Sequence, residues 1–303
     1  MKNVNAGVND DSLPISAPAA HRVADLLALT KPRLNSLVVV TAGIGYYLGA
    51  AGALDLKNLI EAVAGIALVA GGAAGLNQIY ERDTDSLMFR TRMRPVAAHR
   101  VTTGEALAFS LTLAVAGLVI LAVTSNLLAT ILALLTLVSY NAVYTPMKRR
   151  SSLATLVGAI PGALPPMIGW VAARGALTPE AWALFAIVFV WQIPHFMAIA
   201  WLYRADFSRA GFPLLPVVEP SGRSTGRQAV LFSLMLVPIS LIPYFLKMSG
   251  PTYAGGAAAG STALLSLAIS FALKRNDQRA RVLFLGSIAY LPLLWGMLIL
   301  DRP

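Results

Sequence analysis

Three oxygen-bearing side chains, Asn77, Glu81 and Asp85, stand four residues apart at the end of a long apolar run. On an α-helix, successive members of such a series drift by only about 40°, so all three share one face. Carboxylates at this spacing repel each other, so the set would destabilise a helix rather than support the fold. Mg²⁺ prefers oxygen ligands and often binds a few carboxylates together with substrate phosphates. The spacing therefore indicates a divalent-cation site. The alternative is a solvated loop whose acids pair with its own arginines.

The position of Asn77 favours the cation site, because a polar side chain within an apolar span is costly and is functional by default. Downstream stand Arg90, Arg92 and Arg94, followed by Pro95. Guanidinium groups match phosphate oxygens bidentately, so these residues are candidates for binding a phosphorylated substrate. The alternative is the excess of Lys and Arg that membrane proteins carry in their inner loops.

A second polar segment, residues 202–228, follows another apolar run and contains Arg204 and Asp206. We expect it on the same membrane face as the first acids, although each of its charges also fits an ordinary loop. His195 lies just before it, within the apolar run. A lone buried His is more often a hydrogen-bonded structural residue, and the alternatives here are a haem contact or a general base. Tyr80 and Lys148 complete the candidates. Lys148 is the first residue of the basic run 148–150. This run helps to set the orientation of the protein in the membrane or, alternatively, binds a diphosphate.

The composition indicates a membrane protein. Of the 303 residues, 57% are hydrophobic and only 13% are charged, whereas a soluble domain carries about twice that charge density. The absence of Cys excludes disulfides, thiolate nucleophiles and Cys-based metal sites. The net charge of +10 is explained by the inner loops of a membrane protein, so we expect no nucleic-acid partner.

Nine segments approach the roughly 20 apolar residues that cross a bilayer. They are residues 34–54, 59–80, 105–123, 127–144, 153–173, 181–201, 229–248, 254–274 and 281–300. With the N-terminus inside, only Lys57, Arg174, Lys247 and Arg302 of the 24 Lys and Arg residues fall outside. This asymmetry predicts an all-α polytopic protein with nine transmembrane helices, a cytoplasmic N-terminus and an outer C-terminus. We expect residues 1–25 to form a flexible inner tail and residues 26–303 a single domain.

These motifs resemble the membrane prenyltransferase superfamily of intramembrane aromatic prenyltransferases. That family has nine helices and two acidic motifs, in the loops after helices 2 and 6. Its first motif, NxxxDxxxD, stands here as Asn77-xxx-Glu81-xxx-Asp85, with Glu in place of the first Asp. Its second motif holds paired acids in other branches, whereas here only Asp206 is clear.

The resemblance is closer to the protohaem IX farnesyltransferase branch and covers roughly residues 25–300. It is carried by ERDTDSLMFRTRMRP, YTPMKRRSSLATLVGAIPGALPPMIGW, WQIPHF and RADFSRAGFPLLPVV. This resemblance implies transfer of a farnesyl group from farnesyl diphosphate to a vinyl group of haem b, giving haem O. It implies helices around a central cavity that opens laterally to the lipid bilayer.

It also implies Mg²⁺ as cofactor and a bacterial inner-membrane location, with the C-terminus in the periplasm. A haem A synthase or an oxidase assembly protein is the implied partner. On this basis Asn77, Glu81, Asp85 and Asp206 are expected to act as catalytic metal ligands. The residues expected to bind substrate are Arg90, Arg92, Arg94, Lys148, Arg204, His195 and Tyr80. Tyr80, Trp170 and Phe196 are candidates to stabilise an allylic cation through their ring faces, although helix anchoring explains each equally well.

Three rival functions stay open on the sequence alone. A relative of the same superfamily would prenylate a quinone or another tetrapyrrole precursor. A transporter also places polar residues in the membrane, but usually near the midplane rather than at the helix ends. A haem-handling factor without catalytic activity would need His195 and would tolerate loss of the acids.

Overall fold

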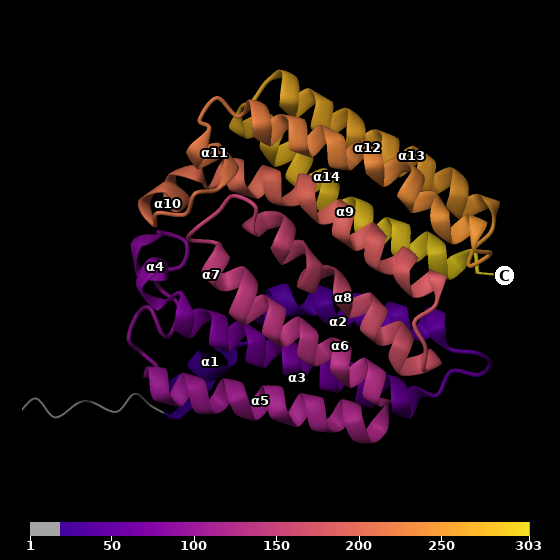
Figure 1. The fold of residues 1–303 in the computed structure, drawn as a ribbon, viewed down its shortest axis with the longest axis horizontal. Helices are drawn as coiled ribbons and strands as arrows, with labels where there is room; N and C mark the ends of the chain where they lie inside the picture. The colour runs from indigo at the N-terminus through magenta and orange to yellow at the C-terminus, as the bar shows by residue number, and fades with distance from the viewer. Residues whose placement is uncertain (1–18, 303) are drawn as a thin grey trace, which may run out of the picture.

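The computed structural model describes residues 19–302, and residues 1–18 and 303 lie outside the described part. The described chain is helical and contains no strand, which confirms the all-α prediction. Its elements, labelled in Figure 1, are α1 (Ala19–Leu29), α2 (Pro32–Gly49), α3 (Leu56–Tyr80), α4 (Arg82–Leu87), α5 (Thr103–Thr124), α6 (Leu127–Val138), the π-helix η1 (Ser139–Tyr144), α7 (Thr145–Met147), α8 (Ala154–Arg174), α9 (Pro179–Leu202), α10 (Arg204–Arg209), α11 (Leu215–Val218), α12 (Arg223–Phe245), α13 (Pro251–Leu273) and α14 (Asp277–Leu300).

Within residues 19–302, eight helical segments are long and apolar enough to cross a bilayer. They are α3, α5, the continuous segment Leu127–Met147, α8, α9, α12, α13 and α14. The helix α2 lies alongside them in the bundle at the place of the first predicted span, so the prediction of nine spans is approximately consistent with the structure. It has 18 residues and begins with the polar sequence PRLNS, so it does not contain a long uninterrupted apolar stretch. The protein is therefore a multi-pass membrane protein.

Small residues bring the long helices close together. A Cβ on Gly169 of α8 would collide with the carbonyl oxygen of Ala42 in α2, and one on Gly72 of α3 would lie 2.6 Å from the Ser110 carbonyl oxygen in α5. Such close approach is the usual way for transmembrane helices to pack without a hydrophobic driving force. Pro161, Pro165 and Pro166 are buried within α8.

Side-chain caps fix several helix starts. Thr102 and Glu105 form a capping box at the start of α5, and the Asn126 and Asn276 side chains accept from backbone N–H groups at the starts of α6 and α14. Each cap satisfies an N–H that would otherwise lack a partner in the first turn. These polar residues separate consecutive apolar runs, so they set where each span begins.

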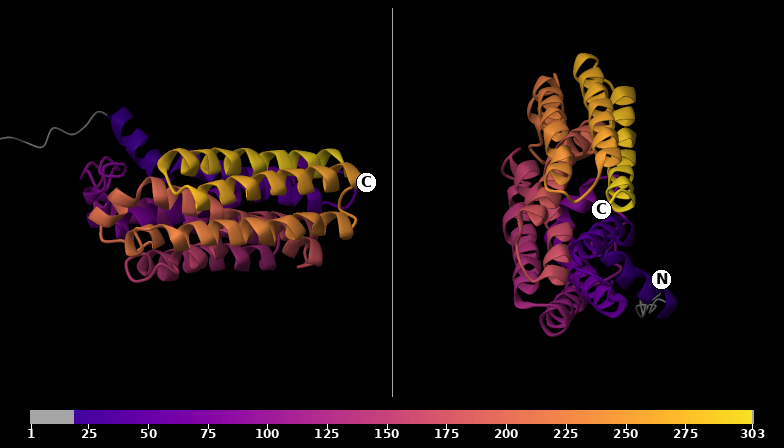
Figure 2. Two further views of the ribbon diagram at one scale, coloured as in Figure 1. Left: turned by 90° about the horizontal axis from the view of Figure 1, so that it is seen from above. Right: turned by 90° about the vertical axis from the view of Figure 1, so that its right-hand side faces the viewer.

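The short helices α4, α10 and α11 gather at one end of the bundle, together with α1 (Figure 1). This end carries both polar segments that the sequence analysis singled out, and the C-terminus lies at the opposite end (Figures 1 and 2). The helix α1 begins at Ala19, inside the segment expected to be a flexible tail. Arg22 of α1 pairs with Glu105, and Asp25 accepts from Arg100 at 2.9 Å, so α1 is tied to the loop before α5. The remainder of the expected tail, residues 1–18, lies outside the described residues.

Candidate active site

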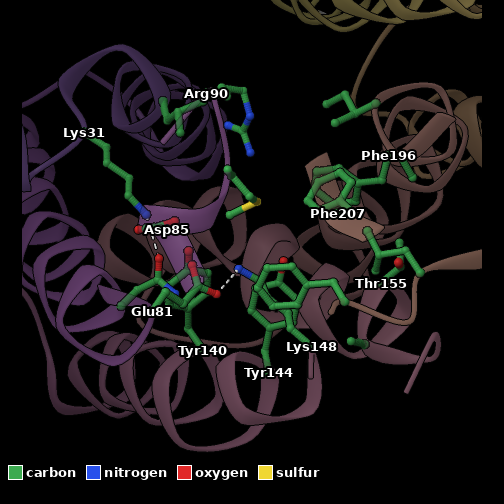
Figure 3. A pocket seen from close by; sticks show the side chains of 18 of the residues that line it. Lys31, Glu81, Asp85, Arg90, Tyr140, Tyr144, Lys148, Thr155, Phe196 and Phe207 are labelled. Atoms are coloured by element: carbon green, nitrogen blue, oxygen red, sulfur yellow. Dashed lines mark hydrogen bonds and ion pairs between the residues drawn. The ribbon is translucent and has the colours of Figure 1, made fainter. Parts of the chain in front are cut away.

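A pocket of about 260 Å³ opens among the helix ends at the α4–α10 end of the bundle. Its walls come from the starts of α2 and α8, the ends of α3 and α9, the π-helix, and the two polar segments (Figure 3). Its lining residues are Lys31, Leu34, Asn77, Glu81, Asp85, Met88, Arg90, Arg94, Tyr140, Tyr144, Lys148, Ala154, Thr155, Phe196, Ile199, Ala200, Phe207, Phe212 and Leu214. One half is charged and the other is aromatic and aliphatic, as a substrate with an anionic head and an apolar body requires.

The predicted oxygen cluster lies on one wall of this pocket. The backbone N–H of Glu81 donates to the Asn77 carbonyl at 2.9 Å, and that of Asp85 donates to the Glu81 carbonyl at 2.7 Å. This i to i−4 pattern continues past the end of α3, so the three side chains keep a common face. Asn77 and Asp85 are fully buried and Glu81 is 5% exposed. The three side chains are therefore not solvated, although Asp85 does pair with Arg94 of its own loop.

Three cationic side chains contact the cluster, each from a different part of the chain, and Figure 3 labels two of them, Lys31 and Lys148. The Nζ of Lys31 donates to Oδ1 of Asn77 at 2.6 Å. The Nζ of Lys148 donates to Oε1 of Glu81 at 2.7 Å. One Nη of Arg94 donates to both Asp85 oxygens, at 2.8 and 2.7 Å. With Arg90, the pocket holds four cationic side chains against two carboxylates, and this excess suits a polyanionic ligand.

The electrostatics of the cluster follow from burial and these pairings. Burial alone would raise the pKa of Glu81, but Lys148, Lys31 and Arg94 outweigh it and hold that pKa below its ordinary value. Burial raises the pKa of Asp85 despite its contact with Arg94. Burial, assisted by Arg94, lowers the pKa of Lys31 to about 7. Desolvation thus acts on Lys31, Glu81 and Asp85, which makes these three groups sensitive to a bound ion.

The donor set fits Mg²⁺. Two buried carboxylates and one amide oxygen offer only hard oxygen ligands at the pocket wall, and substrate phosphates usually complete such a site. In the described part of the chain, no group of three His, Cys, Asp or Glu residues forms a protein-only metal site. A metal site with three protein ligands at this wall would therefore have to include the Asn77 amide oxygen.

The π-helix supplies an aromatic wall. The rings of Tyr140 and Tyr144 lie 5.3 Å apart, and the Lys148 Nζ lies 4.5 Å from the centroid of the Tyr144 ring. The N–H of Thr145 bonds to the Tyr140 carbonyl five residues back, and Pro146 has no N–H with which to restore the α-helical pattern. The Thr145 hydroxyl also accepts from Nδ2 of Asn77 at 3.2 Å. This irregular turn therefore fixes both the tyrosines and the orientation of the Asn77 amide.

Four predicted substrate-binding residues lie outside the pocket lining. Arg92 stacks on the Phe89 ring, with 4.5 Å between its Cζ and the ring centroid. Arg204 pairs with Asp277 at 2.8 Å. Tyr80 is 50% exposed. His195 faces α14, where its Nδ1 lies 2.8 Å from the Ser287 hydroxyl. Of the predicted cation-stabilising rings, only Phe196 lines the pocket, since Trp170 is buried elsewhere in the core.

Asp206 is near the pocket but does not line it. Its carboxylate accepts from Nη1 of Arg209 at 2.9 Å and from the backbone N–H groups of Phe89 and Arg90, each at 3.4 Å. Arg90 in turn lies over the Tyr203 ring, 5.3 Å from its centroid. Asp206 thus connects the second polar segment to the loop that presents Arg90. The structure does not place its carboxylate beside Glu81 and Asp85.

Sequence reasoning missed Lys31, Tyr140 and Tyr144 as pocket residues. Tyr140, Tyr144 and Lys148 are spaced by four, like the acidic set, and this repetition was a signal for a second face turned toward the same site. In the sequence, Lys31 is simply one of the positive charges expected on the inner side. Its contact with Asn77, 46 residues away, depends on how α2 meets α3, so no local pattern reveals it.

Known proteins resemble this chain in both sequence and fold. The model of the UbiA prenyltransferase family matches residues 38–294. A protoheme IX farnesyltransferase of Solibacter usitatus is 47% identical over 288 residues, which cover 92% of this chain and 99% of that protein. A protoheme IX farnesyltransferase of Koribacter versatilis is 41% identical over 302 residues, covering 95% and 97%.

Solved structures share the fold at low identity. A digeranylgeranylglyceryl phosphate synthase has a TM-score of 0.79 at 17% identity, covering 93% of this chain and 98% of that one. A UbiA homolog from Archaeoglobus fulgidus bound to GPP and Mg²⁺ has a TM-score of 0.64 at 15% identity, covering 91% and 99%. The family match and the extent of sequence identity agree with the helical architecture. The chain belongs to the UbiA prenyltransferase family.

Proposed function

We propose that this protein transfers the farnesyl group of farnesyl diphosphate to a vinyl group of haem b, with addition of water, to give haem O. The relative of 47% identity, which carries the name of that activity, aligns over almost its whole length. The observation that carries the proposal is the buried set of Asn77, Glu81 and Asp85 in a pocket with four cationic side chains. A transporter has no need for such a site at one end of the bundle.

The charged half of the pocket binds the diphosphate in this proposal. Asn77, Glu81 and Asp85 would hold Mg²⁺, which would supply positive charge to the leaving diphosphate. Arg90, Arg94 and Lys148 reach the remaining phosphate oxygens from three sides. Because these groups are already in place, and the side chains of Arg94 and Lys148 are only 20% exposed, they stabilise charge that develops during the reaction with little reorganisation.

The reaction begins when the allylic C–O bond breaks and its electron pair leaves with the diphosphate. The farnesyl cation that remains needs an apolar, electron-rich environment that excludes water. Phe196, Phe207 and the faces of Tyr140 and Tyr144 line the pocket beyond the cations. Aromatic faces attract a cation within about 6 Å, so these rings stabilise the farnesyl cation and direct it toward the acceptor.

The acceptor step forms one C–C bond. The π electrons of a haem vinyl group attack the farnesyl cation, and the positive charge moves to the vinyl carbon next to the ring. Water adds at that carbon and its proton is released to solvent, which leaves a hydroxyethylfarnesyl group. The overall change consumes farnesyl diphosphate, haem b and water, and produces haem O and diphosphate.

Asp206 assists rather than binds the catalytic ion in this proposal. Its bonds to the Phe89 and Arg90 amides hold the loop that points Arg90 into the pocket. Three other predicted residues line no part of the pocket, namely Arg92, Arg204 and Tyr80. In this proposal they stabilise the surrounding loops and contact the membrane interface.

The proposal also includes a location. The end of the bundle that carries the pocket faces the cytoplasm of a bacterial inner membrane, and the C-terminus faces the periplasm. The bias of Lys and Arg toward that end supports this orientation. A haem A synthase or an oxidase assembly protein is the partner that would receive the product.

Product identification tests the proposed function. Purified protein is incubated with haem b, farnesyl diphosphate and Mg²⁺, and the tetrapyrroles are separated and identified by mass. The proposal predicts haem that has gained one farnesyl group and one water. Parallel reactions with a quinone precursor and with metal-free protoporphyrin test the rival acceptors. Prenylation of the quinone precursor with haem left unchanged would replace the proposed acceptor.

A further inference from the structure

His195 is held rigidly between two helices in the membrane-spanning part of the protein. Its ring stacks on Trp191 of α9 and lies beside Phe284 of α14, with centroid distances of 5.1 Å in both cases. Its Nδ1 lies 2.8 Å from the Ser287 hydroxyl, and the Trp191 indole N–H donates to the Ser287 carbonyl at 2.8 Å. The ring therefore has little freedom to rotate.

The hydrogen bonds around Ser287 determine which ring nitrogen carries the proton. The Ser287 hydroxyl donates to the Phe284 carbonyl at 2.7 Å, so its single proton is already engaged. Both contacts are made at once when this oxygen accepts from His195, and we therefore assign the proton to Nδ1, with a lone pair on Nε2. Within residues 19–302, no hydrogen bond reaches Nε2, and the ring is only partly buried.

A purely structural histidine is a poor explanation for this arrangement. An acceptor without a partner is costly in the bilayer, where water does not compensate for it. By contrast, a histidine that binds a metal nearly always donates its other ring N–H to a second group, which fixes the tautomer and the ring orientation. The Ser287–His195 pair has this form, with Nε2 as the free ligand atom.

The position of His195 relates it to the pocket. Ile199 lies one helical turn further along α9, on the same face, and lines the pocket, as does the adjacent Phe196. At a rise of 1.5 Å per residue, His195 lies about 6 Å along the helix axis from Ile199. It is thus one turn deeper in the membrane than this apolar wall of the pocket, where an apolar acceptor would lie beside the farnesyl chain.

We propose that Nε2 of His195 is an axial ligand to the iron of the tetrapyrrole acceptor, and that Ser287 is its positioning residue. Imidazole nitrogen is a common axial ligand of haem iron. The bond would fix the acceptor in the bilayer and limit which vinyl group reaches the farnesyl cation. This inference rests on the proposed function, because it takes haem b as the acceptor.

The test measures binding without the prenyl substrate. The full-length protein in detergent is titrated with ferric haem b and, separately, with metal-free protoporphyrin IX, and the haem complex is examined by absorption and electron paramagnetic resonance spectroscopy. The wild type is expected to show an imidazole-ligated spectrum. His195→Ala is expected to lose that spectrum and to bind haem more weakly, while it binds metal-free protoporphyrin as the wild type does. Added imidazole should restore the spectrum.

Two further variants separate ligation from packing. Ser287→Ala keeps the ligand but loosens its orientation, so we expect the imidazole-ligated spectrum with about tenfold weaker haem binding. His99→Asn is the matched control, because His99 is exposed and has a positive φ of 56° that Asn tolerates. It should match the wild type. If His195→Ala is not monodisperse, His195→Met tests the ligation instead, because it keeps a side chain of similar length. The haem complex of His195→Met should then show a thioether-ligated spectrum.

The outcomes distinguish this inference from the proposed function. A wild-type spectrum that matches that of His195→Ala, or equal loss of metal-free protoporphyrin binding in the variant, would overturn ligation by His195. If the wild type still made haem O, the proposed function would stand. Imidazole-ligated haem in a wild type that transfers no farnesyl group would instead support the ligand and reject the proposed function.

Discussion

Lys148 Nζ lies 2.7 Å from Glu81 Oε1, although 67 residues separate the two in the chain. The contact joins the π-helical segment after α6 to the end of α3, and it places a cation beside one carboxylate of the proposed metal site. Glu81 is 5% exposed, so Lys148 compensates a charge that would be costly to bury alone. The same lysine is therefore both part of the fold of the pocket and a candidate to bind the diphosphate.

Replacing Lys148 tests its role in substrate binding. Lys148→Met keeps the apolar stem and removes the charge, so we expect the KM for farnesyl diphosphate to rise about tenfold, the worth of one charge-assisted hydrogen bond. The KM for haem should not change. Arg150→Ala, an exposed member of the same basic run, serves as the control. An equal rise for both variants would show that only the overall positive charge of the loop matters.

Gly158 tests the importance of the aromatic wall. A Cβ at this position would lie 2.6 Å from Cδ2 of Tyr144, so Gly158→Ala forces that ring to shift. Overpacking of this kind costs about 1–3 kcal/mol, and we expect a lower Tm together with slower farnesyl transfer. Gly296→Ala, in a helix position with open space around it, should change neither. Wild-type Tm and transfer rate in Gly158→Ala would mean that the ring position is unimportant.

Asp206 distinguishes a loop-holding role from metal ligation. Asp206→Ala removes the acceptor for the Phe89 and Arg90 amides. We expect a higher KM for farnesyl diphosphate, because Arg90 is no longer held, and an unchanged concentration of Mg²⁺ at half-maximal rate. Rates are measured across a Mg²⁺ series at saturating haem. A large increase in the Mg²⁺ requirement would show that Asp206 is a metal ligand, as the family motif first suggested.

Metal removal tests the cofactor itself. EDTA should stop farnesyl transfer, and excess Mg²⁺ should restore it, because Glu81 and Asp85 require a cation between them and the diphosphate. Ca²⁺ is expected to restore less activity, since its longer bonds and higher coordination number fit a compact site poorly. Full activity in EDTA would contradict the need for a metal ion. It would mean that Lys31, Arg94 and Lys148 alone neutralise the charge of the diphosphate.

Much of the fold was predictable because each transmembrane helix is a local feature. Apolar runs located the spans, together with the alternation between inner loops rich in Lys and Arg and outer loops poor in them. Polar caps such as Asn126 and Asn276 mark where helices begin. The boundaries were less accurate. The first span was expected to reach residue 54, but α2 ends at Gly49. The run continues with Ala and Gly, which are apolar enough to extend a hydropathy signal without extending a helix.

The site was predictable only where it follows one continuous helical spacing in the sequence. Asn77, Glu81 and Asp85 follow from helical periodicity, and the structure keeps them together. Lys31 and Tyr140 meet them through packing between distant segments, which spacing does not encode. Conversely, Arg204 and Tyr80 lie close in sequence to motif residues, but their side chains point elsewhere, since neighbours on a helix are about 100° apart.

Asp85 gives the most direct test of the central claim, that buried oxygen ligands at the end of the bundle activate a prenyl diphosphate. Asp85 is fully buried, whereas Asp83, on the same short helix, has a side chain that is 81% exposed. In single-turnover farnesyl transfer to haem b, Asp85→Asn should lose activity by at least about a hundredfold while remaining folded, and Asp83→Asn should react like the wild type. Equal rates for the two variants would contradict the account.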